Sequence, residues 1–516
     1  FFKQKTAYEF MPSLVGSEMC IRDRRSKMAR IAGILSANGQ EVVKKMLQKM
    51  THKNSQLGDI WSGSQATLGT VKLVNLPEEP GPLDNSSRET NIIMDGRLTH
   101  PEKLPGSEGE NANNLKEALL ASWAQSGGEL FDHLEGDYAL AMVTSDTLVL
   151  ARDRLGVRPL YYGFHHSHFC FASEIKALVD VVDEVREFPP GHFFIANSGL
   201  FPFKPYLPAD INFASPQDSA RQLYSCLDKA VQRAIPASET AIGVWLSGGI
   251  DSSAMAALAK NHIAHLHTFS AGVKGAPDLE HARLVADHIG SIHHERLYTL
   301  QETLAVLDKV IYHLESFDAP LIRSAVGNYL VAEMAAEHVA FILSGEGGDE
   351  LFAGYDYQKN CQSDVELTIC IQEAIAALHN TALQRVDRSA IAHGHGVVTP
   401  FLDPEVVRLA LAIPARWKIY DQDKIEKWPL RQAVAEYLPA KVVNRRKEKF
   451  WQGAGVWEMI ADYAEEKISD EEFVNSRIIK ENFHLRSKEE LLYYKIFKSF
   501  FGQKVPLEEI GRTKHI

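Results

Sequence analysis

An apolar segment that runs directly into Ser247-Gly248-Gly249-Ile250-Asp251-Ser252-Ser253 places the tightest constraint on the fold of this chain. Residues 240–246 read as a buried strand and residues 252–260 as a helix, so the two glycines fall in a strand-to-helix turn. Such a turn directs the free N–H groups of a helix N-terminus at a bound anion. No Gly-Lys-Ser/Thr follows at the Walker A spacing, so the turn predicts a phosphate loop of another type.

A second loop of the same kind, residues 344–349 (SGEGGD), follows a strand predicted at residues 340–343. Parallel strands meet at one edge of the sheet with their carboxyl ends, so we expect both loops to lie at that edge. Asp251 and Asp349 are then predicted ligands of Mg²⁺, because carboxylate oxygens suit a hard cation. Helix capping is the alternative role for both aspartates.

The two parts of the chain differ in the secondary structure that their sequences predict. Residues 28–206 read as short strands and turns, with a hairpin at residues 139–151, and a proline-rich linker follows at residues 201–212. Residues 207–516 alternate strands with amphipathic helices, as in a parallel α/β sheet, and become mostly helical from about residue 365. One of these helices is predicted to be capped by Asp278 and to end at Gly290. We therefore expect domains at residues 28–206 and 207–516.

Residues 1–27 show no helical or strand periodicity and no signal-peptide layout. They look like a translated sequencing-library adaptor, so we exclude them from the fold as non-native and expect the natural start at Met28. The other start-like pair, Met19-Cys20, would leave ten residues between its cysteine and the strand that begins at Ile31. A catalytic role for Cys20 is therefore not expected.

Composition excludes several classes of protein. A formal net charge of −12 and a pI near 6.0 argue against a nucleic-acid partner, because phosphate contacts need clustered basic residues. No run of about 18 apolar residues is present, so we expect no membrane span. The five cysteines are scattered without a CxxC pair, which fits a reducing compartment, and we expect the cytoplasm.

Longer stretches carry a resemblance to a known family. They are the two loops above, residues 134–136 (LEG), 151–161 (ARDRLGVRPLY), 172–178 (ASEIKAL), 187–191 (EFPPG), 399–403 (TPFLD) and 445–450 (RRKEKF). On these stretches the chain resembles the asparagine synthetase family from Met28 to about Phe500. The resemblance implies an α+β, Ntn-hydrolase-like glutaminase sandwich followed by an α/β ATP-pyrophosphatase domain.

The resemblance also implies a chemistry. A carboxylate, aspartate by default, attacks the α-phosphorus of ATP to give an acyl-adenylate and pyrophosphate, and ammonia then displaces AMP. Lys447 would stabilise charge at phosphorus, Glu346 would take a proton from the attacking amine, and Arg323 would lie near the substrate. A solvated basic run is the alternative for Lys447. The implied contacts to ATP and pyrophosphate are Leu246, Ser247, Gly248, Gly249, Asp251, Ser252, Ser253, Ser344 and Gly345.

The chain departs from the family throughout the glutamine pocket. Ala29 stands where the nucleophilic cysteine belongs, Lys53 begins the segment that replaces an Arg-Gly-Pro-Asp turn, and Leu115 replaces the aspartate that holds the glutamine amine. The family's Asn-Gly-Glu reads Asp95, Gly96 and Arg97 here. We predict that this half folds but does not hydrolyse glutamine, so ammonia arrives free or from a separate protein.

One departure falls in the synthetase half, where the family's Glu-x-Arg reads Gly396-Val397-Val398. The carboxylate substrate is therefore open, and an offshoot that cyclises or amidates another acid, as β-lactam synthetases do, is the first alternative. A non-catalytic homologue acting as a partner subunit is the second, and a tRNA-modifying ATP pyrophosphatase is the third. Whether the chain forms a homodimer is also open.

Overall fold

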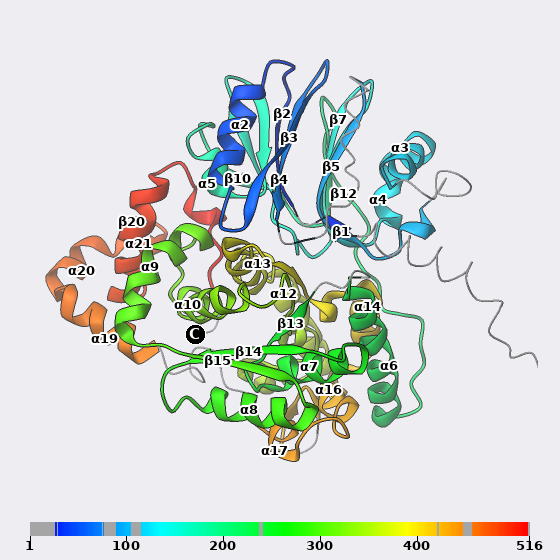
Figure 1. Ribbon diagram of the computed structural model, residues 1–516, viewed down its shortest axis with the longest axis vertical. Helices are drawn as coiled ribbons and strands as arrows, with labels where there is room; N and C mark the ends of the chain where they lie inside the picture. Colours follow the sequence, from blue (N-terminus) through cyan, green and yellow to red (C-terminus); the bar gives the residue numbers. More distant parts are fainter. Residues whose placement is uncertain are drawn as a thin grey trace, which may run out of the picture.

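The computed structural model describes residues 26–27, 29–74, 76, 89–104, 115–236, 241–420, 423–446 and 457–513. Figure 1 shows two sheets facing each other at the top and one further sheet below them, with helices on both of its faces. Within the described residues, no helix has both the length and the apolar character that crossing a membrane requires.

The upper part is a sandwich of two antiparallel sheets, and among the described residues each has six strands. The first sheet has the order β1 (Ser26–Lys27), β5 (Asn91–Leu98), β6 (Gly136–Val143), β7 (Leu148–Arg152), β11 (His192–Ile195) and β12 (Gly199–Pro202). The second has the order β10 (Arg186–Glu187), β8 (Tyr161–His165), β9 (His168–Ala172), β2 (Ala29–Ile34), β4 (Thr67–Leu73) and β3 (Ser55–Ser62). Ile31, Ala139, Leu150 and Phe171 fill the space between them. The α+β sandwich predicted from the resemblance is confirmed.

Helices cover the outer faces of the sandwich: α2 (Gln40–Lys49) and α5 (Ile175–Leu178) on one side, α3 (Leu115–Ser126) and α4 (Leu130–His133) on the other (Figure 1). The predicted hairpin is β6 and β7. Ser26 and Lys27 form β1 and pair with Arg97 and Gly96 of β5, and the non-native origin of residues 1–27 stays a prediction. Without them β5 would be an edge strand with unpaired N–H and C=O groups. Cys20 and Met28 lie outside the described residues.

The lower sheet has five strands among the described residues, all parallel, in the order β15 (Ile292–Leu297), β14 (His267–Gly272), β13 (Ile242–Trp245), β16 (Phe341–Leu343) and β17 (Gly396–Val398). The predicted parallel α/β sheet is therefore confirmed. The helix α8 (Pro277–Ile289) ends at Gly290 as predicted, with φ +64°. Its N-cap is Ala276 instead of Asp278, because Pro277 already occupies the first turn and the Asp278 carboxylate pairs with Arg445.

The remaining elements surround this sheet. They are α6 (Pro216–Ala234), α7 (Ile250–His262), α9 (Leu300–Leu314), α10 (Ala319–Ala335), α11 (Gly348–Leu351), α12 (Asp364–Ala376), α13 (Ala382–His393), α14 (Pro404–Ala412), α15 (Ala415–Lys418), α16 (Trp428–Ala433), α17 (Ala440–Val443), α19 (Trp457–Lys467), α20 (Asp470–Ser476), α21 (Lys488–Phe501), and the short strands β18 (Ile419–Tyr420), β19 (Ile425–Glu426), β20 (Ile478–Lys480) and β21 (Phe483–His484). The helical character predicted beyond residue 365 is confirmed. The first two residues of the predicted linker belong to β12, and no helix or strand follows until α6.

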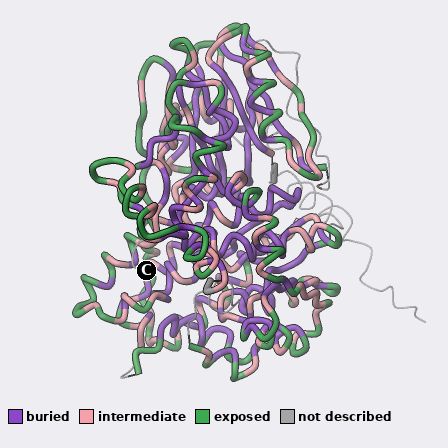
Figure 2. Tube along the Cα trace, turned by 90° about the vertical axis from the view of Figure 1, so that its left-hand side faces the viewer, coloured by how far each residue is buried: buried purple, intermediate pink, exposed green. Residues whose placement is uncertain are grey.

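The two parts share a core. One apolar cluster contains Leu178 of the sandwich together with Phe317 and Ile322 of the α/β part. Figure 2 shows buried chain (purple) continuing through the level at which the two parts meet. In Figure 1, α13 lies at this level, directly below the sandwich. The interface is therefore packed, and α13 is one of the elements that form it.

Candidate active site

The first glycine-rich loop lies at the carboxyl end of β13 and opens α7, as predicted. The Ser247 N–H and the Ser247 hydroxyl each lie 3.1 Å from Ser252 Oγ, and the Gly249 N–H donates to Ser247 Oγ at 3.3 Å. Gly248 has φ +72°, and a Cβ there would come within 2.6 Å of the Ala282 backbone, so only glycine fits. The loop is thus held by its own serines, with its backbone close against α8.

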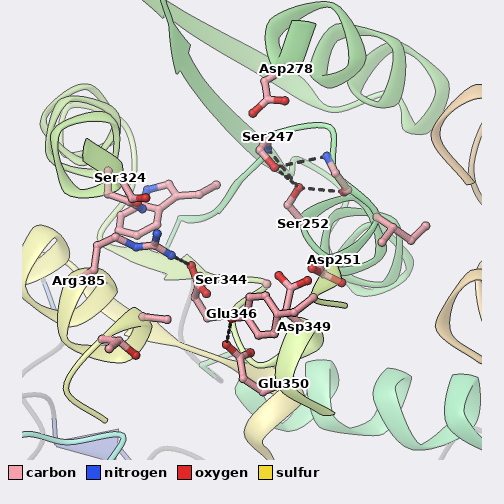
Figure 3. Close-up of a pocket in the computed structure, with 18 of the residues that line it drawn as sticks. Ser247, Asp251, Ser252, Asp278, Ser324, Ser344, Glu346, Asp349, Glu350 and Arg385 are labelled. Atoms are coloured by element: carbon pink, nitrogen blue, oxygen red, sulfur yellow. Dashed lines mark hydrogen bonds and ion pairs between the residues drawn. The ribbon is translucent and has the colours of Figure 1, made fainter. Parts of the chain in front are cut away.

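The second loop follows β16 and packs against the first. A Cβ on Gly345 would approach Ser252 N to 2.8 Å, and one on Gly348 would approach Asp251 Oδ1 to 2.6 Å. Gly347 has φ +96°, which turns the chain into α11. These glycines let the two loops touch. Figure 3 shows Asp251 and Asp349 close together between the loops, with Ser247 and Ser252 above them.

A cavity of about 330 Å³ opens between these loops, a size that suits a small-molecule ligand. The predicted residues that line it are Leu246, Ser247, Gly249, Asp251, Ser252, Ser344, Gly345, Glu346 and Asp349. Gly248 and Ser253 do not line it, because Gly248 faces α8 and Ser253 is fully buried on α7. Nine of its other lining residues are charged: Asp278, Glu350, Glu373, Arg385, Lys427, Arg431, Arg445, Arg446 and Arg512.

Lys427 is a part of this site that the sequence did not reveal. Its Nζ lies 2.5 Å from Asp349 Oδ1 and also pairs with Asp251 Oδ2, and its side chain is 1% exposed. The lack of a side chain at Gly354 makes room for it, since a Cβ there would come within 2.2 Å of Lys427 Cε. Two carboxylates that converge on one buried cation form a donor set that also fits Mg²⁺.

Glu346 meets a second cation that the sequence did not reveal. It forms an ion pair with Arg385 of α13, which crosses the cavity to reach it (Figure 3). Nearby, burial together with the charges of Asp349 and Glu346 raises the pKa of Glu350 to about 7, and the Tyr355 hydroxyl donates to the same carboxyl. The Glu350 carboxyl therefore holds its proton more tightly than an exposed glutamate does.

The other two predicted catalytic residues are Arg323 and Lys447. Arg323, on α10, directs its Nε at Glu489 Oε1 of α21 at 2.9 Å and is absent from the cavity lining. Lys447 lies outside the described residues, although Arg445 and Arg446 just before it line the cavity. Arg445 donates to Asp278 Oδ1 at 2.7 Å.

The altered glutaminase positions lie in the sandwich. Ala29 begins β2, Asp95 and Gly96 lie within β5, and Leu115 begins α3. The Arg97 Nε donates to Asp137 Oδ2 at 3.1 Å, and Lys53 is exposed in the turn before β3. Arg30, beside Ala29, sends its guanidinium to Asp95 Oδ2 at 2.7 Å. A charged side chain thus lies against the residue that replaces the family's asparagine.

The substituted segment Gly396–Val398 is the edge strand β17, and all three of its residues are buried. No charged side chain replaces the family's Glu-x-Arg within it. Instead, Arg158 of the sandwich donates to the carbonyl of Val397 at 2.8 Å. The two halves are therefore also joined at this strand.

The chain thus joins a two-layer sandwich to a parallel sheet whose two glycine-rich loops border one cavity. Residues 222–368 and 370–510 match the family model described as asparagine synthase, and residues 28–188 match the one described as a glutamine amidotransferase domain. The chain is 31% identical over 509 residues to asparagine synthetase B (glutamine-hydrolyzing) of Escherichia coli K12, covering 92% of this chain and 91% of that protein. It is 32% identical over 534 residues to a probable asparagine synthetase (glutamine-hydrolyzing) of Dictyostelium discoideum, covering 93% and 96%. The chain belongs to the asparagine synthetase family.

Proposed function

We propose that this chain is an ATP-dependent ligase that activates a carboxylate, aspartate by preference, as an acyl-adenylate and then amidates it with ammonia. The observation that carries the proposal is the convergence of Asp251 and Asp349 in one cavity, from the helices α7 and α11 that follow the neighbouring parallel strands β13 and β16. Aspartate is the expected substrate because the relatives are named as asparagine synthetases.

In the first step a carboxylate oxygen of the substrate bonds to the α-phosphorus of ATP, and pyrophosphate leaves. The N–H groups of the first turn of α7 and the hydroxyls of Ser247 and Ser252 are suited to bind the phosphates of ATP. Asp251 and Asp349 would hold Mg²⁺, which supplies charge neutralisation at the phosphates. Lys427 adds a further positive charge beside them, and Lys447 is proposed to stabilise charge at the reacting phosphorus.

In the second step the nitrogen of ammonia bonds to the acyl carbon, and AMP leaves with the electrons of the broken C–O bond. Glu346 is the proposed acceptor of the proton that the attacking amine releases. Arg385 pairs with that carboxylate and holds it toward the cavity. Arg323 donates to Glu489 and does not line the cavity, and its role near the substrate stays a prediction.

Ammonia is proposed to come from solution or from another protein. Ala29 has no atom that could attack glutamine, and Arg30 lies against Asp95 where an uncharged amide-binding group would be needed. The sandwich is therefore retained without glutaminase chemistry.

Pyrophosphate release with ATP, Mg²⁺ and ammonium, measured across a panel of carboxylic acids, tests the activity and its substrate together. We expect release with aspartate and none from Asp251→Ala. A parent chain that releases no pyrophosphate with any acid would show that it is a non-catalytic homologue. Release with another acid but not with aspartate would assign the chain to an offshoot of the family.

A further inference from the structure

Arg30 joins three separate segments of the chain through one guanidinium. Its Nε donates to Glu174 Oε1 at 2.8 Å, one terminal nitrogen donates to Asp95 Oδ2 at 2.7 Å, and the other pairs with Asp387 of α13. The side chain is 1% exposed, so each of these contacts is buried. Arg30 stands where the family segment Met-Cys-Gly-Ile has glycine. One of the two ion pairs between the sandwich and Asp387 is therefore made by a residue that the family pattern lacks, and Arg158 makes the other at 3.3 Å.

Arg30 belongs to a larger buried group whose charges balance. The other cations are Arg158, Lys176 and Arg388, and the anions are Asp95, Glu174, Glu315 and Asp387. Glu315, Asp387 and Arg388 come from the α/β part, and the others come from the sandwich. Removing one cation from such a group leaves one negative charge in excess among buried carboxylates, which is strongly unfavourable.

The sandwich holds α13 at a second point. The Asn54 Nδ2 donates to the carbonyl of His393, the last residue of α13, at 3.1 Å. Gly394, with φ +83°, lets the chain pass so close that a Cβ there would lie 2.5 Å from Asn54 Cβ. Asn54 belongs to the segment that replaces the family's Arg-Gly-Pro-Asp turn. Two segments altered in the glutamine pocket therefore contact α13, one at its middle and one at its end.

The same helix carries Arg385 into the synthetase cavity, where it pairs with Glu346. Residues two apart on a helix point to nearly opposite sides, so α13 presents Asp387 to the sandwich and Arg385 to the cavity. We propose that Arg30 and Asn54 are positioning residues: they fix α13 so that Arg385 holds Glu346 for amide formation. This inference rests on the proposed function. Two residues from the altered glutamine pocket would thus position a helix of the synthetase site.

Kinetics can separate this role from a general loss of stability. Neither residue contacts the loop of Ser247 to Ser253, so Arg30→Met should leave the KM for ATP unchanged. It should lower kcat for amide formation with ammonium by about 2- to 30-fold, the range typical of coupling through a packed element. Arg30→Lys keeps the charge but loses the forked geometry, so its kcat should lie between those of the parent and Arg30→Met.

A double-mutant cycle tests whether Arg30 acts through Arg385. If it does, Arg30→Met should lower kcat in the parent chain but not further in an Arg385→Met background. Additive losses would overturn the proposal. Should Arg30→Met fail to fold, the same cycle with Asn54→Ala, which removes one hydrogen bond, replaces it.

Arg97→Met is the matched control, because Arg97 is also a buried arginine of the sandwich but forms its ion pair with Asp137 of the same sheet instead of with α13. It should lower the thermal midpoint without changing kcat per folded molecule, and equal kcat losses in both variants would contradict the proposal. Hydrogen exchange gives a readout that does not depend on activity. Exchange of the α13 amides should speed up in Arg30→Met and not in Arg97→Met, and this remains measurable if the proposed function fails.

Discussion

Lys427 Nζ lies 2.5 Å from Asp349 Oδ1, and both groups face the cavity between the two glycine-rich loops. The same ammonium pairs with Asp251, so two carboxylates from the first turns of α7 and α11 are held by one buried cation. The arrangement brings together residues 176 positions apart in sequence. It also makes the stability of the site dependent on a cation.

Replacing Lys427 by Met should therefore expose a requirement for Mg²⁺. Without the metal, the free energy of unfolding should fall by about 3 kcal/mol, because removing one member of a buried pair leaves the other charges uncompensated. Adding Mg²⁺ should then stabilise the variant more than the parent, as measured by denaturant unfolding with and without MgCl₂. Lys424→Met is the control, because Lys424 is exposed nearby. Equal responses of Lys427→Met and the parent to Mg²⁺ would contradict this account.

Glu346→Gln should separate the two half-reactions. The amide cannot take the proton released by the attacking amine, so amide formation should fall by about 10²- to 10⁴-fold while adenylation continues. Amide formation and pyrophosphate release are assayed in parallel. Glu373→Gln, at another acidic residue lining the cavity, should leave both rates near those of the parent. A parallel loss of both rates in Glu346→Gln would place Glu346 in the first step.

Arg323→Met distinguishes a structural contact from a substrate contact. Its partner Glu489 is 2% exposed, so the free energy of unfolding should fall by roughly 3 kcal/mol. The KM for the carboxylate should stay the same, because Arg323 does not line the cavity. Steady-state kinetics and denaturant unfolding on the same preparation provide the comparison. A large rise in the KM for the carboxylate would instead restore the role implied by the family resemblance.

Acid should weaken the fold through His294 on β15. Burial, followed by the charges of His338 and His267, lowers its pKa from about 6.5 to about 4. The folded-state pKa lies below the unfolded one, so this stabilising contribution is complete above pH 6.5 and is lost as the pH falls toward 4. In His294→Gln, the thermal midpoint should fall less between pH 7 and pH 5 than in the parent. The exposed His288 serves as the control, and a His288→Gln variant should follow the parent curve.

A structural feature could be predicted from the sequence where the residues that define it are neighbours in the chain. Strand, glycines and helix follow one another in residues 240–260, so the first loop and its place at the sheet edge could be predicted from local rules. Lys427 and Arg385 could not, because each meets its partner across a long sequence separation and neither lies in a glycine-rich loop. The position of Asp278 was misjudged because Pro277 already satisfies the first turn of α8.

Arg30 did leave a local signal. It is the one charged residue in the segment Ala29–Ile34, which is otherwise apolar and forms a central strand of its sheet. A charge in a buried strand must be compensated, which predicts carboxylate partners without naming them. Only the fold identifies Asp95, Glu174 and Asp387 as those partners.

The nitrogen source tests the central claim most directly. The full chain is supplied with ATP, Mg²⁺ and aspartate, and the amide product is quantified with ammonium or with glutamine as the only nitrogen donor. We predict amide formation with ammonium and none above background with glutamine, and no release of glutamate from glutamine. Amide formation from glutamine at the rate seen with ammonium would contradict the account.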